Sequence, residues 1–109
     1  MDLENITIDE VIKILHKTSD ENIIIVEREK NSNIMYEFNI TTTQAKDVIR
    51  HLEKTDLHSG PLTDNDKTKN YPLWVFKKRI NLVNCYIKLK IVNYGKNVLV
   101  ISFHKDDYS

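Results

Sequence analysis

The segment from Cys85 to His104 constrains the fold more than any other part of the chain. It reads CYIKLKIVNYGKNVLVISFH, two runs of alternating apolar and other residues on either side of the turn-forming residues 93–97. Alternation of this period is typical of a half-buried strand, and a short Gly/Asn loop between two such runs indicates a β-hairpin. We therefore expect two antiparallel strands joined by a tight turn.

Residue parity predicts which side chains of this hairpin share a face. The apolar residues of both runs are expected on one buried face: Ile87, Leu89, Ile91, Leu99, Ile101 and Phe103. A one-residue slip would turn a whole set to the other side, so the register must keep this parity. The simplest register that does so has three cross-strand pairs: Val92 with Val98, Lys88 with Ser102, and Tyr86 with His104. A phenol, an ammonium and an imidazole would then lie within cross-strand reach on the opposite face, which makes this face a candidate site.

Two helices are expected in the N-terminal half. Thr7 with Glu10, and Thr41 with Gln44, have the spacing of capping boxes at helix starts. Apolar residues follow each of them at helical spacing: Ile8, Val11, Ile12 and Leu15 in the first helix, and Ala45, Val48, Ile49 and Leu52 in the second. The first helix is expected to end at about Lys17 and the second near residue 54. Both would present an apolar face that can cover a sheet.

Four further stretches complete the expected architecture. Residues 23–30 read as a strand, and residues 73–80 as a strand antiparallel to the one that begins at Cys85. Residues 34–40 fit either a strand or a helical turn, and the polar, aperiodic residues 56–70 are expected to form a long loop. The chain is therefore expected to be a single α+β domain over residues 1–109. In it, an antiparallel sheet from the C-terminal half packs against two helices from the N-terminal half.

The connection between the strands at residues 73–80 and 85–92 sets a further register. If Lys78 pairs with Tyr86, Lys78 joins the candidate site, and Trp74 and Phe76 lie on the same face. Both aromatic residues are nevertheless more typical of a core than of a base-stacking platform.

Composition excludes several classes of protein. No stretch approaches the roughly 20 apolar residues of a membrane span, and no basic-plus-apolar leader opens the chain. The single cysteine, Cys85, cannot form an internal disulfide, which fits a reducing cytoplasm. Its parity predicts a buried structural thiol. We expect a cytoplasmic protein without a membrane partner.

The zero formal net charge conceals two segments of opposite sign. Residues 1–66 contain seven lysines and arginines and 14 acidic residues, whereas residues 67–105 contain nine lysines and arginines and no acidic residue. Such asymmetry is typical of a chain with a polyanionic partner. The alternative is that the two halves neutralise each other within the fold. Because the cations share their segment with the candidate site, we favour a nucleic-acid partner.

The sequence lacks the patterns of most catalytic sites. It has no Gly-rich phosphate loop, no pair of cysteines at metal-binding spacing and no nucleophile elbow. We expect no metal and no cofactor. What remains fits a metal-independent ribonuclease, because RNA supplies its own nucleophile, the 2′-hydroxyl. Histidine can transfer the protons, lysine and arginine can stabilise the charged phosphorane, and tyrosine can orient the phosphate or stack on a base.

In order and spacing, the segments LWVF, CYIKLKI and LVISFH resemble the C-terminal half of the MqsR family of toxins from type II toxin–antitoxin systems. The upstream pattern is similar too, with Arg28, Lys30-Asn31, a helix over residues 42–52, Asp56, Gly60-Pro61 and Asp64. The resemblance covers roughly residues 28–105. It implies a RelE-like fold and an mRNA interferase, an endoribonuclease that cleaves messenger RNA and is held inactive by a cognate antitoxin.

The resemblance implies that four residues of this chain occupy site positions of the family. Tyr86 and Lys88 match the tyrosine and lysine of the family's YIKL or YLKI motif. His104 matches a basic position after Ser-Phe, and Lys78 matches the lysine that follows the Trp-containing strand.

The chain departs from the family pattern at two positions. Some members have a lysine where this chain has Ser59, and some have a glutamine where it has Val75. Those roles would have to be filled by other residues, such as His58 or Lys69, or the activity would be weakened.

We accordingly assign His104 as the general acid/base, Lys88 and Lys78 as charge stabilisers, and Tyr86 as the residue that orients the phosphate or stacks on a base. Four more cations are expected to contact the RNA backbone: Lys69, Lys77, Arg79 and Lys90. Two other classes of function stay open. One is a non-catalytic RNA- or DNA-binding module that uses the same basic face. The other is a protein-interaction module in which the acidic and basic halves mediate association.

Overall fold

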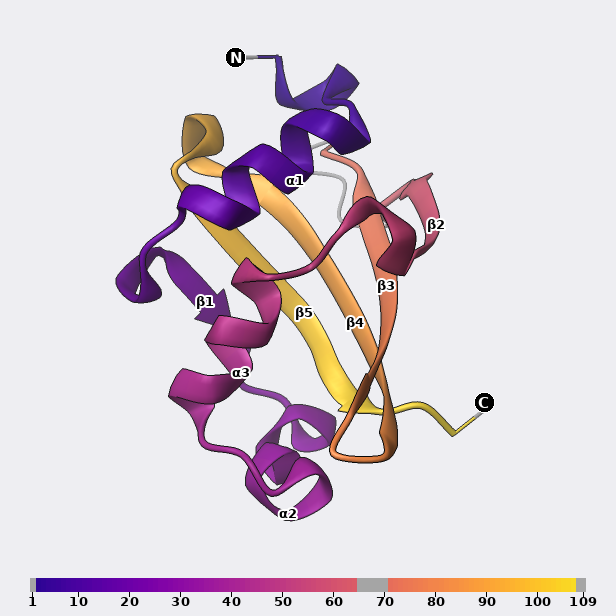
Figure 1. The fold of residues 1–109 in the computed structure, drawn as a ribbon. Coiled ribbons are helices and arrows are strands. Elements are labelled where there is room, and N and C mark those ends of the chain that lie inside the picture. Colours follow the sequence, from indigo (N-terminus) through magenta and orange to yellow (C-terminus); the bar gives the residue numbers. More distant parts are fainter. Residues whose placement is uncertain (1, 65–70, 108–109) are drawn as a thin grey trace.

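A computed structural model describes residues 2–64 and 71–107 of the chain. The fold is α+β, as expected, with the helices in the N-terminal half and most strands in the C-terminal half (Figure 1). In chain order the elements are α1 (Ile8–Lys17), β1 (Ile23–Ile25), α2 (Ile34–Phe38), α3 (Thr42–Arg50), β2 (Leu57–Leu62), β3 (Leu73–Ile80), β4 (Val83–Val92) and β5 (Asn97–Lys105). None of the helices in the described part of the chain has both the length and the apolar character needed to cross a bilayer.

The five strands form one mixed sheet in the order β1-β5-β4-β3-β2. Within the four strands β2 to β5, each neighbouring pair is antiparallel, as expected for the C-terminal half. The short strand β1 adds to the outer edge of β5 in parallel. It ends at Ile25 instead of continuing through Lys30, because the charged residues that follow enter a 3₁₀ turn, Glu29–Asn33, beside β5.

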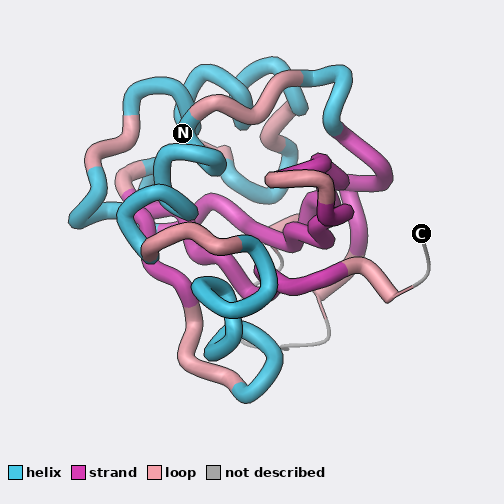
Figure 2. Tube along the Cα trace, turned by 60° about the horizontal axis from the view of Figure 1, so that its bottom comes forward, coloured by secondary structure: helices cyan, strands magenta, loops and turns pink. Residues whose placement is uncertain are grey.

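Helices α1 and α3 cross one face of the sheet (Figure 1). Both begin with the expected capping box, in which the threonine side chain accepts a hydrogen bond from the backbone N–H of the third helical residue, and the side chain of that residue accepts one from the threonine backbone N–H. Their apolar faces and the facing strands build one hydrophobic cluster, which includes Val11, Leu15, Ala45, Ile49, Phe76, Ile87 and Leu89. In Figure 2 the strands run through the middle of the molecule, with the helical segments around them. Helix α3 ends at Arg50, earlier than expected.

Two segments differ from expectation or resolve an ambiguity. Residues 34–40 contain the short helix α2, which ends at Phe38 and is capped by Asn39 in the left-handed conformation (φ 56°). The prediction of a loop over residues 56–70 is wrong over its first part, where Leu57–Leu62 pairs with β3 as an edge strand. Gly60 has φ +136° there, and a Cβ at this position would lie 2.8 Å from Cε3 of Trp74. Only glycine therefore fits where β2 passes so closely over the tryptophan.

The hairpin of β4 and β5 keeps the expected register at its open end. Tyr86 pairs with His104, and Lys88 pairs with Ser102. Ile87 and Phe103 form the pair between them, and both are fully buried. This end of the hairpin therefore has the two faces that parity predicts.

The register shifts just beyond Lys88, towards the turn. Leu89 pairs with Val100, so Ile101 is an extra residue on β5 and forms a β-bulge. The expected pairing of Val92 with Val98 is wrong, since Val92 pairs with Asn97. The bulge also reverses the expected faces near the turn. Val98 and Val100 are fully buried, whereas Leu99 and Ile101 are partly exposed.

The pairing of β3 with β4 differs from the expected one by a single residue. Lys77, not Lys78, lies opposite Tyr86, and Lys78 lies opposite Cys85. The cause is a two-residue turn, in which Asn81 and Leu82 both have positive φ (48° and 68°). Trp74 and Phe76 consequently belong to the buried cluster beneath the helices and not to the face of the candidate site.

Candidate active site

The sheet face opposite the helices carries the polar side chains of the hairpin. Alternation along β4 and β5 places Tyr86, Lys88, Ser102 and His104 on this face. The rings of Tyr86 and His104 are stacked, with 5.3 Å between centroids and 17° between planes. Lys88 lies opposite Ser102 in the next cross-strand pair of this face. The expected grouping of phenol, ammonium and imidazole is therefore present.

A backbone contact orients the imidazole of His104. Its Nδ1 lies 2.9 Å from the carbonyl oxygen of Lys105. Because a carbonyl oxygen only accepts hydrogen bonds, Nδ1 is the donor and carries the proton. In the neutral ring, Nε2 then has the free lone pair, and no described residue forms a hydrogen bond with it. The geometry thus presets Nε2 to accept a proton from a bound molecule.

A segment from the N-terminal half completes the site. Asn31 is buried and forms three hydrogen bonds of 2.9 Å. Two of them tie this segment to β5: its Nδ2 donates to the carbonyl oxygen of Ile101, and its Oδ1 accepts from the amide of Phe103. In the third, Nδ2 donates to the carbonyl oxygen of Val26 in its own segment. The side chain of Asn31 therefore continues the edge bonding of β5 where β1 has ended.

Arg28 and Lys30 flank this anchor and bring two cations to the site. The Nη1 atom of Arg28 donates to the carbonyl oxygen of Ile101 and to Oγ of Ser102, at 3.3 Å each. Sequence reasoning gave neither cation a role. The signal that could have found them was the resemblance itself, which runs through Arg28 and Lys30-Asn31.

These elements enclose a cavity of about 290 Å³. It is lined by Arg28, Lys30, Tyr86, Lys88, Ser102 and His104 and by two carboxylates, Asp106 and Asp107, of which Asp106 is paired with Lys77. Within the described residues no carboxylate pairs with Lys88, so its charge is available to a ligand. Three cations, an imidazole and a phenol that converge in one cavity fit an anionic ligand that undergoes proton transfer.

Lys78 lies apart from this cavity. It is on the opposite side of β3 from Lys77, and its Nζ is 3.5 Å from Oδ2 of Asp56. The one-residue difference in pairing thus separates it from Tyr86. Lys77 takes the position beside Tyr86, with its Nζ 3.1 Å from Oδ2 of the buried Asp106.

The other cations expected to bind RNA differ in their exposure and in their ion-pair partners. Lys90 is buried, and its Nζ is 2.5 Å from Oδ2 of Asp64, so an internal carboxylate neutralises its charge. Arg79 is exposed at the end of β3 opposite Asn84. Lys69 lies outside the described residues.

The two departures from the family pattern lie side by side on the sheet. Ser59 pairs with Val75, and Val75 pairs with Lys88. The residues that some family members carry at these positions would therefore extend the same cross-strand row as Lys88. His58, considered as a substitute, is an exposed residue of the edge strand β2.

Cys85, next to Tyr86 in the chain, belongs to the buried cluster on the other face. Desolvation by burial, and next the negative charge of Glu37, raises the pKa of its thiol far above the ordinary value. A thiol that stays protonated is a poor nucleophile. The expectation of a buried structural thiol is confirmed.

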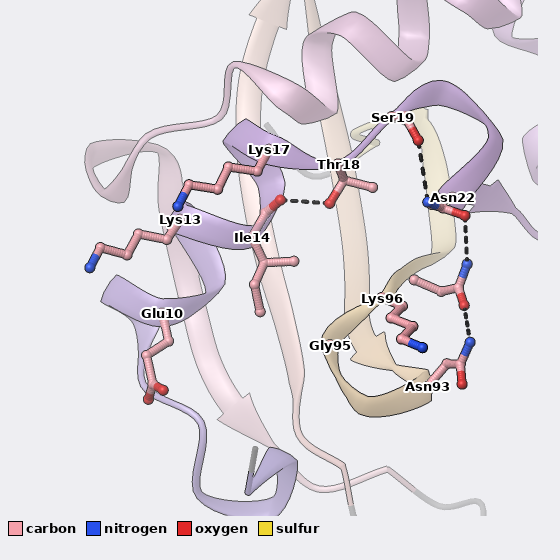
Figure 3. A pocket seen from close by; sticks show the side chains of 11 residues that line it. Glu10, Lys13, Ile14, Lys17, Thr18, Ser19, Asn22, Asn93, Gly95 and Lys96 are labelled. Atoms are coloured by element: carbon pink, nitrogen blue, oxygen red, sulfur yellow. Dashed lines mark hydrogen bonds between the residues drawn. The ribbon is translucent and has the colours of Figure 1, made fainter.

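A larger hollow, of about 650 Å³, lies between α1 and the turn that joins β4 to β5 (Figure 3). Its amide side chains bond to one another, from Asn93 to Asn97, from Asn97 to Asn22 and from Asn22 to Ser19. Its carboxylate, Glu10, accepts hydrogen bonds from the backbone and hydroxyl of Thr7. Three lysines, Lys13, Lys17 and Lys96, also line the hollow, but none of its lining residues is a histidine or a tyrosine. We therefore place the candidate active site at the smaller cavity.

Across residues 2–64 and 71–107, no group of three or more His, Cys, Asp or Glu side chains could hold a metal ion. Comparison of the chain with models of known protein families and with curated proteins found no match in either case.

Proposed function

We propose that this protein is a metal-independent endoribonuclease, a cytoplasmic toxin that cleaves messenger RNA and is inhibited by a cognate antitoxin protein. The observation that carries the nuclease proposal is the stacked Tyr86–His104 pair in one cavity with the ammonium of Lys88. The toxin role and the antitoxin partner rest on the resemblance to the MqsR family.

The cavity suits cleavage by transesterification. The Nε2 atom of His104 takes the proton of the 2′-hydroxyl, the 2′-oxygen forms a bond to phosphorus, and the bond from phosphorus to the 5′-oxygen breaks. The leaving 5′-oxygen takes up a proton from the solvent. Lys88 and Arg28 stabilise the additional negative charge of the phosphorane, which strengthens their interaction as the reaction proceeds. The products are a 2′,3′-cyclic phosphate and a 5′-hydroxyl.

The roles of the remaining residues follow from their positions. Tyr86 holds the imidazole by stacking and presents its hydroxyl to the phosphate. Lys30 lines the cavity and is placed for a contact with the RNA backbone. Lys77, Lys78 and Lys90 have internal carboxylate partners, so we leave them out of the proposed site.

The test is cleavage of single-stranded RNA by the purified protein in EDTA, with product ends identified by mass spectrometry. His104→Ala should keep its circular dichroism spectrum and lose about 10²- to 10⁴-fold in rate. Lys88→Ala should lose about 10²- to 10³-fold, as for the loss of one charge-stabilising donor. Lys78→Ala is the matched control, because it removes a lysine from the same sheet on the other face, and it should cleave like the wild type.

Two results would contradict the proposal. One is cleavage that requires Mg²⁺ and leaves 5′-phosphates. The other is equal rates for wild type and His104→Ala. Tight RNA binding by a wild-type protein that never cleaves would instead favour the non-catalytic module. In bacterial cells, expression of the wild type but not of His104→Ala should arrest growth, and a cognate antitoxin should relieve the arrest.

A further inference from the structure

A second cavity, of about 270 Å³, adjoins the candidate active site. It shares Tyr86 and Lys88 with the first cavity, and its other walls include Leu62, Thr63, Leu73 and Ile101. The first cavity is lined by charged and polar side chains, whereas these walls are mainly apolar. Two adjoining cavities of different chemistry thus meet at one lysine and one tyrosine.

The β-bulge in β5 gives this second cavity one of its apolar walls. A regular register beyond Lys88 would place Ile101 with the buried residues beneath the helices. The extra residue turns Ile101 out of that set, and its side chain lines the cavity instead. Leu62, at the end of β2, lies at the same cavity and leaves 40% of its surface exposed. Exposed apolar surface beside a polar site is typical of a ligand-binding surface.

The carboxylate that lines the second cavity already has a cationic partner. Asp64 lines this cavity, and its Oδ2 is 2.5 Å from Nζ of Lys90, both side chains being largely buried. The pair contributes no net charge, whereas Arg28 and Lys30 line the first cavity but not the second, and Lys88 lines both. The first cavity therefore favours a phosphate, and the second favours a flat, uncharged group that can stack on Tyr86 and contact apolar side chains.

We propose that the second cavity holds a nucleobase of the RNA, the one next to the phosphate bound at Lys88. This inference rests on the proposed function and adds to it a base-binding subsite. Leu62 and Ile101 contact the base, and Tyr86 and Lys88 join the two subsites. A nucleic-acid base has an apolar face and a polar edge, and a platform of apolar and aromatic side chains recognises that face.

The test is methyl NMR of the full chain with 2′-O-methyl dinucleoside monophosphates of each base, which cannot be cleaved. Binding should shift the methyl resonances of Leu62 and Ile101 through the ring current of the base. The methyl groups of Ile24 are the internal control, because this residue is similarly exposed, at 45%, and lies outside both cavities. An abasic counterpart that keeps ribose and phosphate should leave the Leu62 and Ile101 methyl groups unshifted.

Two variants make the test quantitative. Leu62→Ala should weaken binding of the best dinucleotide about fivefold through lost apolar contact, while affinity for the abasic counterpart stays unchanged. Ile24→Ala should leave both affinities unchanged. Binding that shifts the resonances of Tyr86 and His104 but not those of Leu62 and Ile101 would overturn the base subsite alone. Base-dependent shifts in a protein that cleaves no RNA would support the subsite and overturn the nuclease.

Discussion

Adjacent residues of β4 face two different environments. The phenol of Tyr86 is half-buried against an imidazole on the open face, whereas the thiol of Cys85 lies fully buried beneath the helices. Pleating alone produces this contrast, because successive side chains of a strand point to opposite sides. The consequence is chemical. The open face keeps its titratable groups in contact with ligand and water, and the covered face suppresses the ionisation of its thiol.

The buried thiol makes stability depend on pH in a defined direction. Burial raises the pKa of Cys85 in the folded state, whereas an unfolded chain ionises a cysteine at about pH 8.5. The stabilisation is therefore complete below that pH. It declines above that pH by up to about 1.4 kcal/mol per pH unit, as the unfolded chain releases its proton. Urea unfolding from pH 7 to pH 10 should show the gap between wild type and Cys85→Ala narrowing above about pH 8.5.

The comparison with Cys85→Ala removes the contribution of lysines and tyrosines that titrate in the same range. A gap that stays constant with pH would contradict a raised thiol pKa. In the folded protein at pH 8, the thiol should also react with iodoacetamide only as fast as the chain unfolds.

At the scale of elements, the hairpin shows where sequence patterns decide a structure and where they do not. Around Ile87 and Phe103, apolar and polar residues alternate strictly, and the expected register is confirmed. From Val98 to Ile101 every residue is apolar, so the pattern does not show which alternate residues face the core. The bulge therefore leaves no signal in the sequence. The positions of Tyr86 and His104 were predictable, but the apolar wall made by Ile101 was not.

Two further errors have equally local causes. The two-residue turn requires positive φ at Leu82, which a leucine rarely adopts, so the pattern favoured a longer connection and a register that brought Lys78 to Tyr86. The edge strand β2 contains Gly60-Pro61, a dipeptide that is typical of a loop. Gly60-Pro61 directly precedes Leu62, which lines the second cavity.

Asn31 should matter to both stability and the site. Replacement by alanine leaves the amide of Phe103 and the carbonyl of Val26 without these hydrogen bonds, which should cost about 1 to 3 kcal/mol in the free energy of unfolding. The matched control is Asn33→Ala, because Asn33 is exposed in the same turn and should change stability little. Urea denaturation measures both. Equal stabilities for the two variants would show that the Asn31 bridge does not hold this segment to β5.

At the scale of the whole molecule, the two oppositely charged segments neutralise each other in part. Two lysines of the basic segment pair with carboxylates of the acidic half, Lys78 with Asp56 and Lys90 with Asp64, and Lys77 pairs with Asp106, which follows the basic segment. The alternative of neutralisation within the fold therefore holds for part of the charge. Internal pairing consumes part of the basic segment, and the cavity gains Arg28 and Lys30 from the acidic half instead. Segment charge alone could not reveal this, since ion pairing depends on the register of β3 and β4.

Because only a few cations line the cavity, we expect the affinity for RNA to fall modestly with salt concentration, in proportion to the number of phosphate contacts. Arg28, Lys30 and Lys88 are the cations of the cavity, and three phosphate contacts to a single strand give a slope of log K against log salt of about −2. Lys88→Gln and Arg28→Gln should each reduce the slope by about 0.7, because each removes one contact. Fluorescence anisotropy of a labelled 2′-O-methyl RNA between 50 and 200 mM salt, roughly the range in which such effects are large, measures the slope.

Lys78→Gln is the control and should leave the slope unchanged, since Asp56 already neutralises that lysine. An affinity that does not vary with salt, or a slope that falls equally in all three variants, would show that the phosphates are bound elsewhere.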